Sequence, residues 1–199
     1  MMFRLASPIS IGLLLGASLL LLEGCKQKST ANAPEVTLGD LTLRNGRLCP
    51  TGTTNPFTGR MVELYPGGSM KSRTDISNGW IHGFSIGWYT NGQMQIQEPF
   101  STGLSHGLRT KWYENGQKQS EAPIRFGKIE GTFRHWDNQG RLTEEIEMKA
   151  GEPDGVSRAY YPDGSIKVRA VLAKGKVIDR KTWKAGEYRE KPDGKKNSQ

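Results

Sequence analysis

Glycine recurs along this chain in three sets, and each set keeps a spacing of 24 residues without a slip. The sets are Gly59, Gly83, Gly107, Gly131 and Gly155; Gly68, Gly92, Gly116, Gly140 and Gly164; and Gly79, Gly103, Gly127, Gly151 and Gly175. A fixed period of this length indicates a repeat architecture, in which each unit packs mainly on its neighbours. The pattern also favours an extended surface over a catalytic pocket.

Each unit of 24 residues is predicted to form one β-hairpin. In the unit from Gly107, a short run ends at Trp112-Tyr113, Asn115-Gly116 follows, and a second run extends to Ile124. Asn-Gly between two strand-like runs is a strong hairpin signal, because a type I′ turn needs positive φ at both central residues. The equivalent pairs are Gly67-Gly68, Asn91-Gly92, Gln139-Gly140 and Asp163-Gly164. The first and third glycine sets are expected at bends between hairpins, or where a ring covers bare backbone.

Two columns of large side chains follow the opening glycines. The ring column is Leu64, Trp88, Trp112, Trp136 and Tyr160, and the next position holds Tyr65, Tyr89, Tyr113, Asp137 and Tyr161. Adjacent strand residues point to opposite faces, so these columns are expected on opposite sides of the sheet. An aliphatic column lies eighteen places into each unit: Ile76, Phe100, Ile124, Met148 and Leu172. The ring and aliphatic columns are predicted to form one thin core, and Pro99 and Pro123, which lack an N–H, are predicted at edges or strand ends.

The N-terminus has the features of an export leader. Arg4 supplies a positive charge, and residues 9–22 are an apolar run too short to span a bilayer with room to spare. The run ends at Leu22-Glu23-Gly24-Cys25, which resembles the bacterial lipobox, where the thiol is lipidated and the preceding peptide is removed. The resemblance implies a lipid on Cys25, and Lys26 favours sorting to the outer membrane, facing the periplasm. A plain secretory signal and an uncleaved anchor are the alternatives.

These observations divide the chain into segments. They are a lipoprotein signal peptide (1–24), a flexible tether (25–38), an N-terminal capping hairpin (39–58), five repeats (59–82, 83–106, 107–130, 131–154 and 155–178), a degenerate C-terminal cap (179–190) and a disordered tail (191–199). Asn45-Gly46 is the expected turn of the capping hairpin. At the far end Asp179 replaces the periodic glycine and Trp183 stands one place early, so the register slips or ends there. The predicted fold class is all-β, a single elongated sheet of hairpins.

The pattern G-x-x-x-x-W-Y-x-N-G, seen in the unit from Gly107, resembles the MORN repeat, and more closely its bacterial variant in exported and antitoxin-like proteins. The resemblance covers residues 55–178. It implies hairpins in one sheet, no catalysis in the repeats, and roles in scaffolding or partner binding. Some eukaryotic members are associated with membranes or anionic lipids.

The chemistry-bearing residues do not indicate an enzyme. His82 and His106 hold the same place in consecutive units, so they are interpreted as structural repeat elements, and His135 stands apart. G-x-S-x-G, H-E-x-x-H and a phosphate-binding glycine loop are absent from the sequence. With Cys25 lipidated, Cys49 stands alone and is interpreted as a small buried residue, or else as one half of an intermolecular disulfide. No metal site and no cofactor are predicted.

Three binding hypotheses remain. The first is a lipid-tethered scaffold that presents Tyr65, Tyr89, Tyr113 and Tyr161 to another envelope protein, because tyrosine offers area and a hydroxyl at low entropic cost. The second is an envelope polymer stacked on exposed rings. The third is an anionic lipid surface, bound through Arg134, Arg158, Lys167 and Arg169, since the net charge is +8. An antitoxin-like role rests on the family resemblance alone, and nucleic acid is not expected in this compartment.

Overall fold

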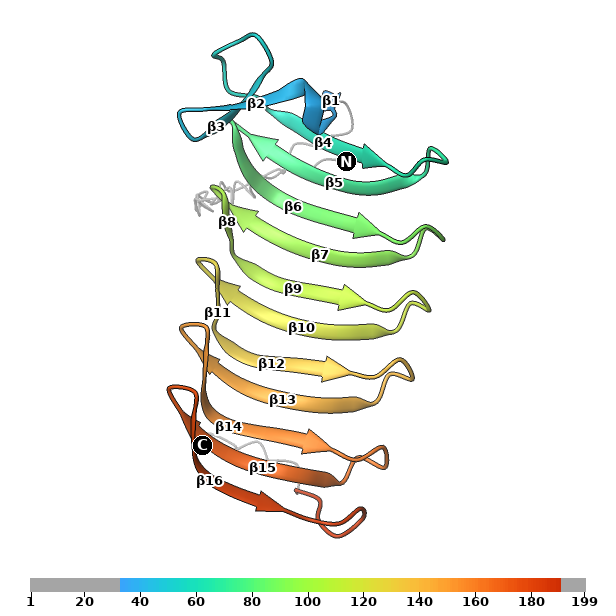
Figure 1. Cartoon of the computed structure of the whole chain (residues 1–199), viewed down its shortest axis with the longest axis vertical. Helices are drawn as coiled ribbons and strands as arrows, with labels where there is room; N and C mark the ends of the chain where they lie inside the picture. Colours follow the sequence, from blue (N-terminus) through green and yellow to red (C-terminus); the bar gives the residue numbers. More distant parts are fainter. Residues whose placement is uncertain (1–32, 191–199) are drawn as a thin grey trace, which may run out of the picture. The chain divides into compact units, whose positions relative to one another are not determined.

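The computed structural model describes residues 33–190, which form two β-sheets and one short 3₁₀ helix, η1 (Leu38–Asp40) (Figure 1). The strands are β1 (Glu35–Val36), β2 (Leu41–Arg44), β3 (Arg47–Pro50), β4 (Gly59–Leu64), β5 (Met70–Ser77), β6 (Trp80–Trp88), β7 (Met94–Ser101), β8 (Leu104–Ser105), β9 (Gly107–Trp112), β10 (Lys118–Arg125), β11 (Lys128–Ile129), β12 (Gly131–Trp136), β13 (Leu142–Lys149), β14 (Glu152–Tyr160), β15 (Ile166–Ala173) and β16 (Lys176–Thr182). The predicted leader, the lipid site at Cys25, the first part of the tether and the tail 191–199 lie outside the described residues.

One sheet holds fourteen of these strands. From β4 to β16 each strand pairs antiparallel with the next main strand along the chain, and the two-residue strands β8 and β11 pair with β7 and β10. The hairpins therefore follow one another in sequence order, as the colours of Figure 1 show. This confirms the predicted all-β fold, a single sheet built from hairpins of 24 residues.

The turn inside each unit differs from the predicted type. In the second unit the Tyr89 N–H donates to the Gln93 carbonyl (2.8 Å), and the Gly92 N–H donates to the Tyr89 carbonyl (2.9 Å). Only the glycine of the Asn91-Gly92 pair has a positive φ, at 83°. The loop is thus a turn of three residues with glycine in the left-handed position, and the register shifts between Gly87 and Trp88. The hairpins were predicted correctly, but the type I′ geometry was wrong at this place.

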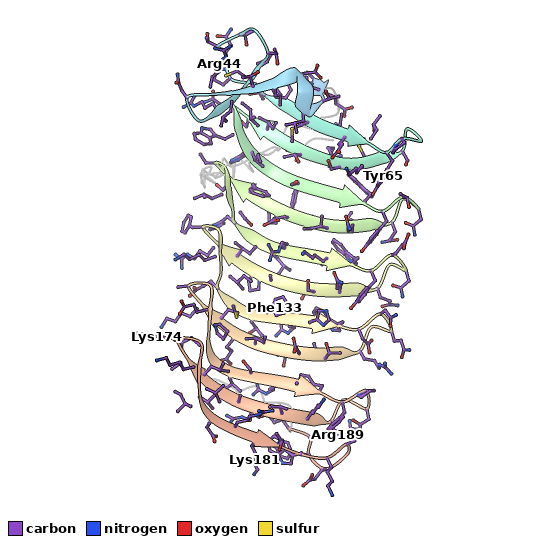
Figure 2. The ribbon with its side chains drawn as sticks, viewed as in Figure 1. Arg44, Tyr65, Phe133, Lys174, Lys181 and Arg189 are labelled. Atoms are coloured by element: carbon purple, nitrogen blue, oxygen red, sulfur yellow. The ribbon has the colours of Figure 1, made fainter. Side chains whose placement is uncertain are left out.

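The type I′ geometry occurs instead at the junctions between units. Phe126 (φ 48°) and Gly127 (φ 79°) join β10 to β11, and the other junctions have the same pair of positive φ angles. Each junction glycine also donates its N–H to a carbonyl one unit earlier, as Gly127 does to Ser105 at 2.8 Å. The two kinds of turn lie along opposite sides of the sheet; Figure 2 shows Tyr65 on one side and Lys174 on the other. The third glycine set therefore marks bends between hairpins, as expected.

From the second unit on, the opening glycines lie where the first strand of a unit bulges. Gly107 has a φ of 127°, and a Cβ built on it would lie 2.6 Å from Cγ of Pro99 on the neighbouring strand. In the unit of Gly83 the neighbour is Asp75, whose carboxylate accepts the Phe84 N–H (3.1 Å). Proline and a carboxylate are thus two ways to fill the same bulge.

This finding corrects the prediction for the two prolines. Pro99 and Pro123 lie inside β7 and β10, well within the sheet, and not at edges or strand ends. Their carbonyls accept the N–H groups of His106 and Glu130 (2.9 Å each). The bulge lies where the proline has no N–H to donate to the ladder. A bulge is one of the positions in a sheet at which proline is tolerated.

The two faces of the sheet carry different columns. Ile124 lies opposite Gly107, and Trp112 is five residues farther along the same strand, so the ring column and the aliphatic column point to opposite faces. We call these the ring face (Trp88, Trp112, Trp136 and Tyr160) and the aliphatic face (Ile76, Phe100, Ile124, Met148 and Leu172). The prediction that both columns share one core was wrong, because Gly107 shares the face of Ile124 and Trp112 is an odd number of positions farther along the strand. Each face instead buries its own side chains in part.

The N-terminal end of the sheet is closed by residues 33–58. β2 and β3 form a separate hairpin whose turn, Asn45-Gly46, is the one predicted. Leu41 and Phe57 pack with Ile76 of the first repeat in a buried cluster. β1 pairs in parallel with β4, so the predicted tether (25–38) is wrong at its end, where Glu35 and Val36 are part of the sheet.

The C-terminal end is closed differently. β16 pairs with β15, and the chain then folds back so that Trp183 stacks on Tyr188 (ring centroids 4.6 Å apart). The Tyr188 carbonyl accepts the Ile166 N–H (2.9 Å), and the Gly186 N–H donates to the Ser165 hydroxyl (2.9 Å). Residues 183–190 therefore cover the last turn of the array.

Candidate interaction surface

The tyrosine column links the units to one another. The hydroxyl of Tyr113 donates to the main-chain carbonyl of Trp136 at 2.9 Å. The same bond recurs from Tyr65 to Trp88 (2.7 Å), from Tyr89 to Trp112 (2.9 Å) and from Tyr161 to Trp183 (3.1 Å). All four tyrosines are half-buried. Their hydroxyls are therefore occupied by the next unit, while the idea that their rings also contact a partner stays a prediction.

Asparagine side chains form a second link beside the tyrosines. Asn91 and Asn115 each accept the N–H of the residue two places on and donate Nδ2 to a carbonyl of the next unit, on Glu114 (3.1 Å) and Asn138 (2.7 Å) respectively. Asp137 takes the tyrosine position of the fourth unit and interrupts that column. It binds Arg141 instead, with 2.7 Å between Arg141 Nε and the carboxylate. On the side of the sheet that carries the turns within the units, side-chain contacts thus join each unit to the next.

Three of the four predicted basic residues, the arginines, lie on the ring face, where carboxylates neutralise them, whereas Lys167 lies over the Tyr161 ring at 5.7 Å. Arg134 pairs with Glu145 (2.8 Å) and Arg158 with Glu190 (2.8 Å). Arg169 also approaches Glu190, at 3.7 Å. These arginines share a face, but they are engaged in ion pairs, so they form no open basic patch.

Glu145 is the centre of this charged cluster. Its carboxylate accepts hydrogen bonds from Arg134 (2.8 Å) and from the Tyr160 hydroxyl (2.7 Å). Burial opposes its charge and is the largest single influence, yet these hydrogen bonds and the charges of Arg134 and Arg158 together lower its pKa below the ordinary value. Burial, followed by the bond to Glu145, raises the pKa of Tyr160. The cluster joins β12, β13 and β14.

The three histidines have separate structural contacts. His82 Nδ1 faces the Thr102 N–H (3.3 Å) at the next junction turn, and His106 packs on Phe126 (ring centroids 4.9 Å apart) in the same relation one unit later. His135 contacts the Thr143 hydroxyl (2.9 Å). The interpretation of His82 and His106 as repeat elements agrees with these contacts. In residues 33–190 no group of three or more His, Cys, Asp or Glu is placed to hold a metal ion.

Cys49 is buried in the N-terminal cap, with 1% of its surface exposed. Its Sγ lies 3.6 Å from the Thr54 carbonyl and 3.8 Å from the Arg47 carbonyl. This matches the interpretation of Cys49 as a small buried residue. Within the described part of the chain, no helix has the length and apolar character needed to cross a membrane.

A row of apolar residues crosses the ring face in the second and third units. Phe84 lies opposite Pro99 in the β6–β7 register, and Leu108 lies opposite Pro123 in the β9–β10 register. The two pairs are neighbours, because Gly107 lies against Pro99. Phe84 is 42% exposed and Leu108 is 50% exposed. We call these four residues the apolar row.

This row was not predicted from the sequence. The two prolines were interpreted as departures from the repeat, and the position after the opening glycine was given no role. That position holds Phe84 and Leu108 in the second and third units, but Thr132 in the fourth. The sequence did carry a signal for the row, namely an apolar residue directly after the opening glycine. At this position next to a bulge the side chain stays exposed, as it does at Phe84 and Leu108.

Comparisons with known proteins agree with this geometry. A family model described as "MORN repeat variant" matches residues 105–125 and 153–171, which cover most of the third and fifth units and begin two residues before each. No curated protein matches the chain. The family match at two of the hairpins of this sheet supports a MORN-repeat protein of the variant type.

Proposed function

We propose that this chain is a non-catalytic protein of the bacterial envelope, held to a membrane by lipid on Cys25, whose repeat sheet binds another protein. The observation that carries the binding proposal is the apolar row. Exposed contiguous apolar surface on a folded domain is typical of interaction sites. A repeat sheet supplies such a surface on a rigid support, because every unit is fixed by both of its neighbours.

The composition around the row favours a protein as the partner. Phe84 and Leu108 lie on the same face as the half-buried rings of Trp88 and Trp112. Aromatic and aliphatic anchors at the centre, with polar residues around them, are typical of protein–protein interfaces. The arginines of the next units are paired with Glu145 and Glu190, which supports a protein surface over an anionic lipid surface.

Site-specific photocrosslinking tests the binding proposal. The full chain carries benzoylphenylalanine in place of Phe84, or in place of Leu43 as a matched control, because Leu43 is exposed in the N-terminal cap. Illumination of bacterial cells should give one discrete protein adduct from position 84 and none from position 43. Adding Leu108→Ser should reduce the adduct from position 84. Equal adducts at both positions, or none at position 84, contradict the proposal.

Binding assays with the same full chain distinguish the other classes of partner. Sedimentation with peptidoglycan that is abolished by F84S/L108S would assign the apolar row to a polymer and contradict a protein partner. Binding to vesicles containing phosphatidylglycerol that disappears at high salt would assign the function to anionic head groups. A discrete adduct with a cytoplasmic toxic protein would favour the antitoxin-like alternative and contradict the envelope location.

The lipid anchor has its own test. Labelling of bacterial cells with a palmitate analogue should mark the wild-type chain and the C49A variant, and it should fail to mark C25S. The labelled chain should fractionate with the outer membrane. Unlabelled wild-type protein, or label that persists in C25S, contradicts the anchor.

A further inference from the structure

We propose that the outer edge of β16 (Lys176–Thr182) binds an extended acidic peptide segment as an additional strand of the sheet. β16 is the last strand in the sheet order and pairs with β15 on one side. Among residues 33–190, no strand pairs with its other side. All seven of its residues are exposed. This site goes beyond the proposed function, because it lies at the edge of the sheet and not on the ring face.

The main chain of β16 offers a regular set of hydrogen-bonding groups. The Trp183 N–H donates to the Lys167 carbonyl (3.1 Å), and Lys181 lies opposite Arg169. In an antiparallel ladder, successive residues direct their N–H and C=O groups alternately to one side and to the other. Arg180 and Thr182 therefore direct theirs away from β15. An exposed edge of this kind is a template for strand addition.

The strand also lacks the glycine bulge of its counterparts in the earlier units. Those strands bulge at a glycine with positive φ, as at Gly155 (124°), whereas Asp179 occupies this place in β16. The register shift between Val171 and Leu172 leaves one extra residue, Ile178, on the β16 side. From Asp179 to Thr182 the pairing is continuous. A second strand can therefore lie along this stretch without having to follow a sharp bend.

The opposite end of the same sheet shows how such an edge is occupied. There the two-residue strand β1 pairs with β4, with Glu35 opposite Arg60. The Glu35 carboxylate lies 3.6 Å from Arg60 Nη1. At this end a strand with an acidic side chain thus meets a basic side chain of the edge strand. The edge at β16 has the basic side chains, and no described strand supplies the acidic partner.

The charge of β16 determines which kind of peptide fits beside it. β16 carries Lys176, Arg180 and Lys181 against Asp179, and Lys174 and Lys184 flank it. Within residues 33–190 none of these cations is in an ion pair, although Lys181 lies over the Trp183 ring at 5.3 Å; Figure 2 shows Lys181 on this last strand. Two copies of this strand would repel each other, so a second copy is a poor occupant. Val177 (58% exposed) and Ile178 (68% exposed) add apolar contact at one end.

Fluorescence anisotropy with synthetic peptides tests the proposal on the full chain. The probe is a labelled peptide of about eight alternating threonine and glutamate residues, a length that matches one strand. It should bind saturably, and the same peptide with lysine in place of glutamate should not. N-methylation of alternate amides along one edge of the acidic peptide should weaken binding about tenfold, because it removes the main-chain donors and keeps the charge. Equal binding of the methylated and unmethylated peptides would reduce the contact to charge attraction and overturn the proposal.

Protein variants locate the site. R180E/K181E should abolish binding of the acidic peptide, while K128E/K149E, the same charge change at distant junction turns, should leave it intact. F84S/L108S should also leave it intact, which separates this site from the apolar row. Circular dichroism checks that each variant is folded. Unchanged binding to R180E/K181E, or self-association of the wild-type chain that excludes the peptide, overturns the proposal.

Discussion

At the scale of single residues, the repeat positions are fixed by the main chain as much as by side-chain packing. Gly107 lies in a bulge where φ is 127° and where Pro99 fills the space that a Cβ would need. A side chain there is strained by its conformation and by contact with the ring. Gly67, in contrast, has no atom within 4 Å of a Cβ position and no φ in the left-handed range. The same residue type therefore has different importance at different places in the unit.

Gly107→Ala should lower the free energy of unfolding by about 1–3 kcal/mol, the usual cost of a strained main-chain conformation together with a close contact. The matched variant Gly67→Ala should change it by less than about 0.5 kcal/mol. Urea unfolding followed by tryptophan fluorescence measures both. Equal effects of the two substitutions would show that the bulge does not require glycine.

The tyrosine hydroxyls give a second prediction at this scale. Tyr113→Phe removes the donor to the Trp136 carbonyl and leaves the ring in place, so it should destabilise the chain by about 0.5–1.5 kcal/mol. Tyr188→Phe is the control, because Tyr188 lies outside the tyrosine column and stacks through its ring on Trp183. Urea unfolding of both variants measures the difference. A Y113F chain as stable as wild type would show that the hydrogen bonds of the tyrosine column do not stabilise the sheet.

At the scale of hairpins, the sequence predicted which segments form strands but not which type of turn occurs at each connection. Asn115-Gly116 marked a hairpin correctly, yet the type I′ geometry lies at Phe126-Gly127, where the sequence offers no asparagine. A phenylalanine at a φ of 48° is unfavourable by itself, so local propensity pointed elsewhere. The short connection between β10 and β11, with two residues in the loop, decides the geometry.

The candidate site was predictable only in part. Arg134, Arg158 and Arg169 were proposed with Lys167 as a basic site, and these three arginines share a face because residues on paired strands that alternate in step share a side. Their neutralisation by Glu145 and Glu190 was not predicted, since Glu190 belongs to the C-terminal cap and binds Arg158, which is 32 residues away in the sequence. The apolar row was missed for a similar reason, because it depends on the approach of Gly107 to Pro99 on the neighbouring strand.

The contact of Glu145 with Arg134 and Tyr160 joins three strands and makes stability depend on pH. Its folded-state pKa is lowered, so its contribution is fully present above the ordinary glutamate pKa of about 4.3 and is lost as the pH falls through the folded value. Wild type should therefore be more stable than E145Q at pH 7, and the difference should shrink as the pH falls below that range. Urea unfolding as a function of pH measures it, with E114Q, an exposed turn residue, as the control. A difference that is constant from pH 7 to pH 3 would contradict the role of the charge.

At the scale of the described sheet, stability comes from contacts between neighbouring units. The hydroxyl of each column tyrosine, the N–H of each junction glycine and the strand pairing all reach one unit forward or back. The buried hydrophobic cluster at the N-terminal cap consists of Leu41, Phe57 and Ile76 with their half-buried neighbours. Such an array should tolerate the loss of a whole unit, because the units on either side present the same surfaces to each other.

Deletion of one repeat tests this arrangement most directly. Removing residues 107–130 joins His106 to Gly131 and keeps the register of every column, whereas removing residues 107–118 takes away half of that length and breaks the register. Urea unfolding monitored by far-UV circular dichroism should show a cooperative transition for the 24-residue deletion, at a midpoint only modestly below that of the intact chain. The 12-residue deletion should unfold at a far lower midpoint or remain unfolded. Equal midpoints for the two deletions, or loss of folding in the 24-residue deletion alone, would contradict a sheet built from interchangeable units.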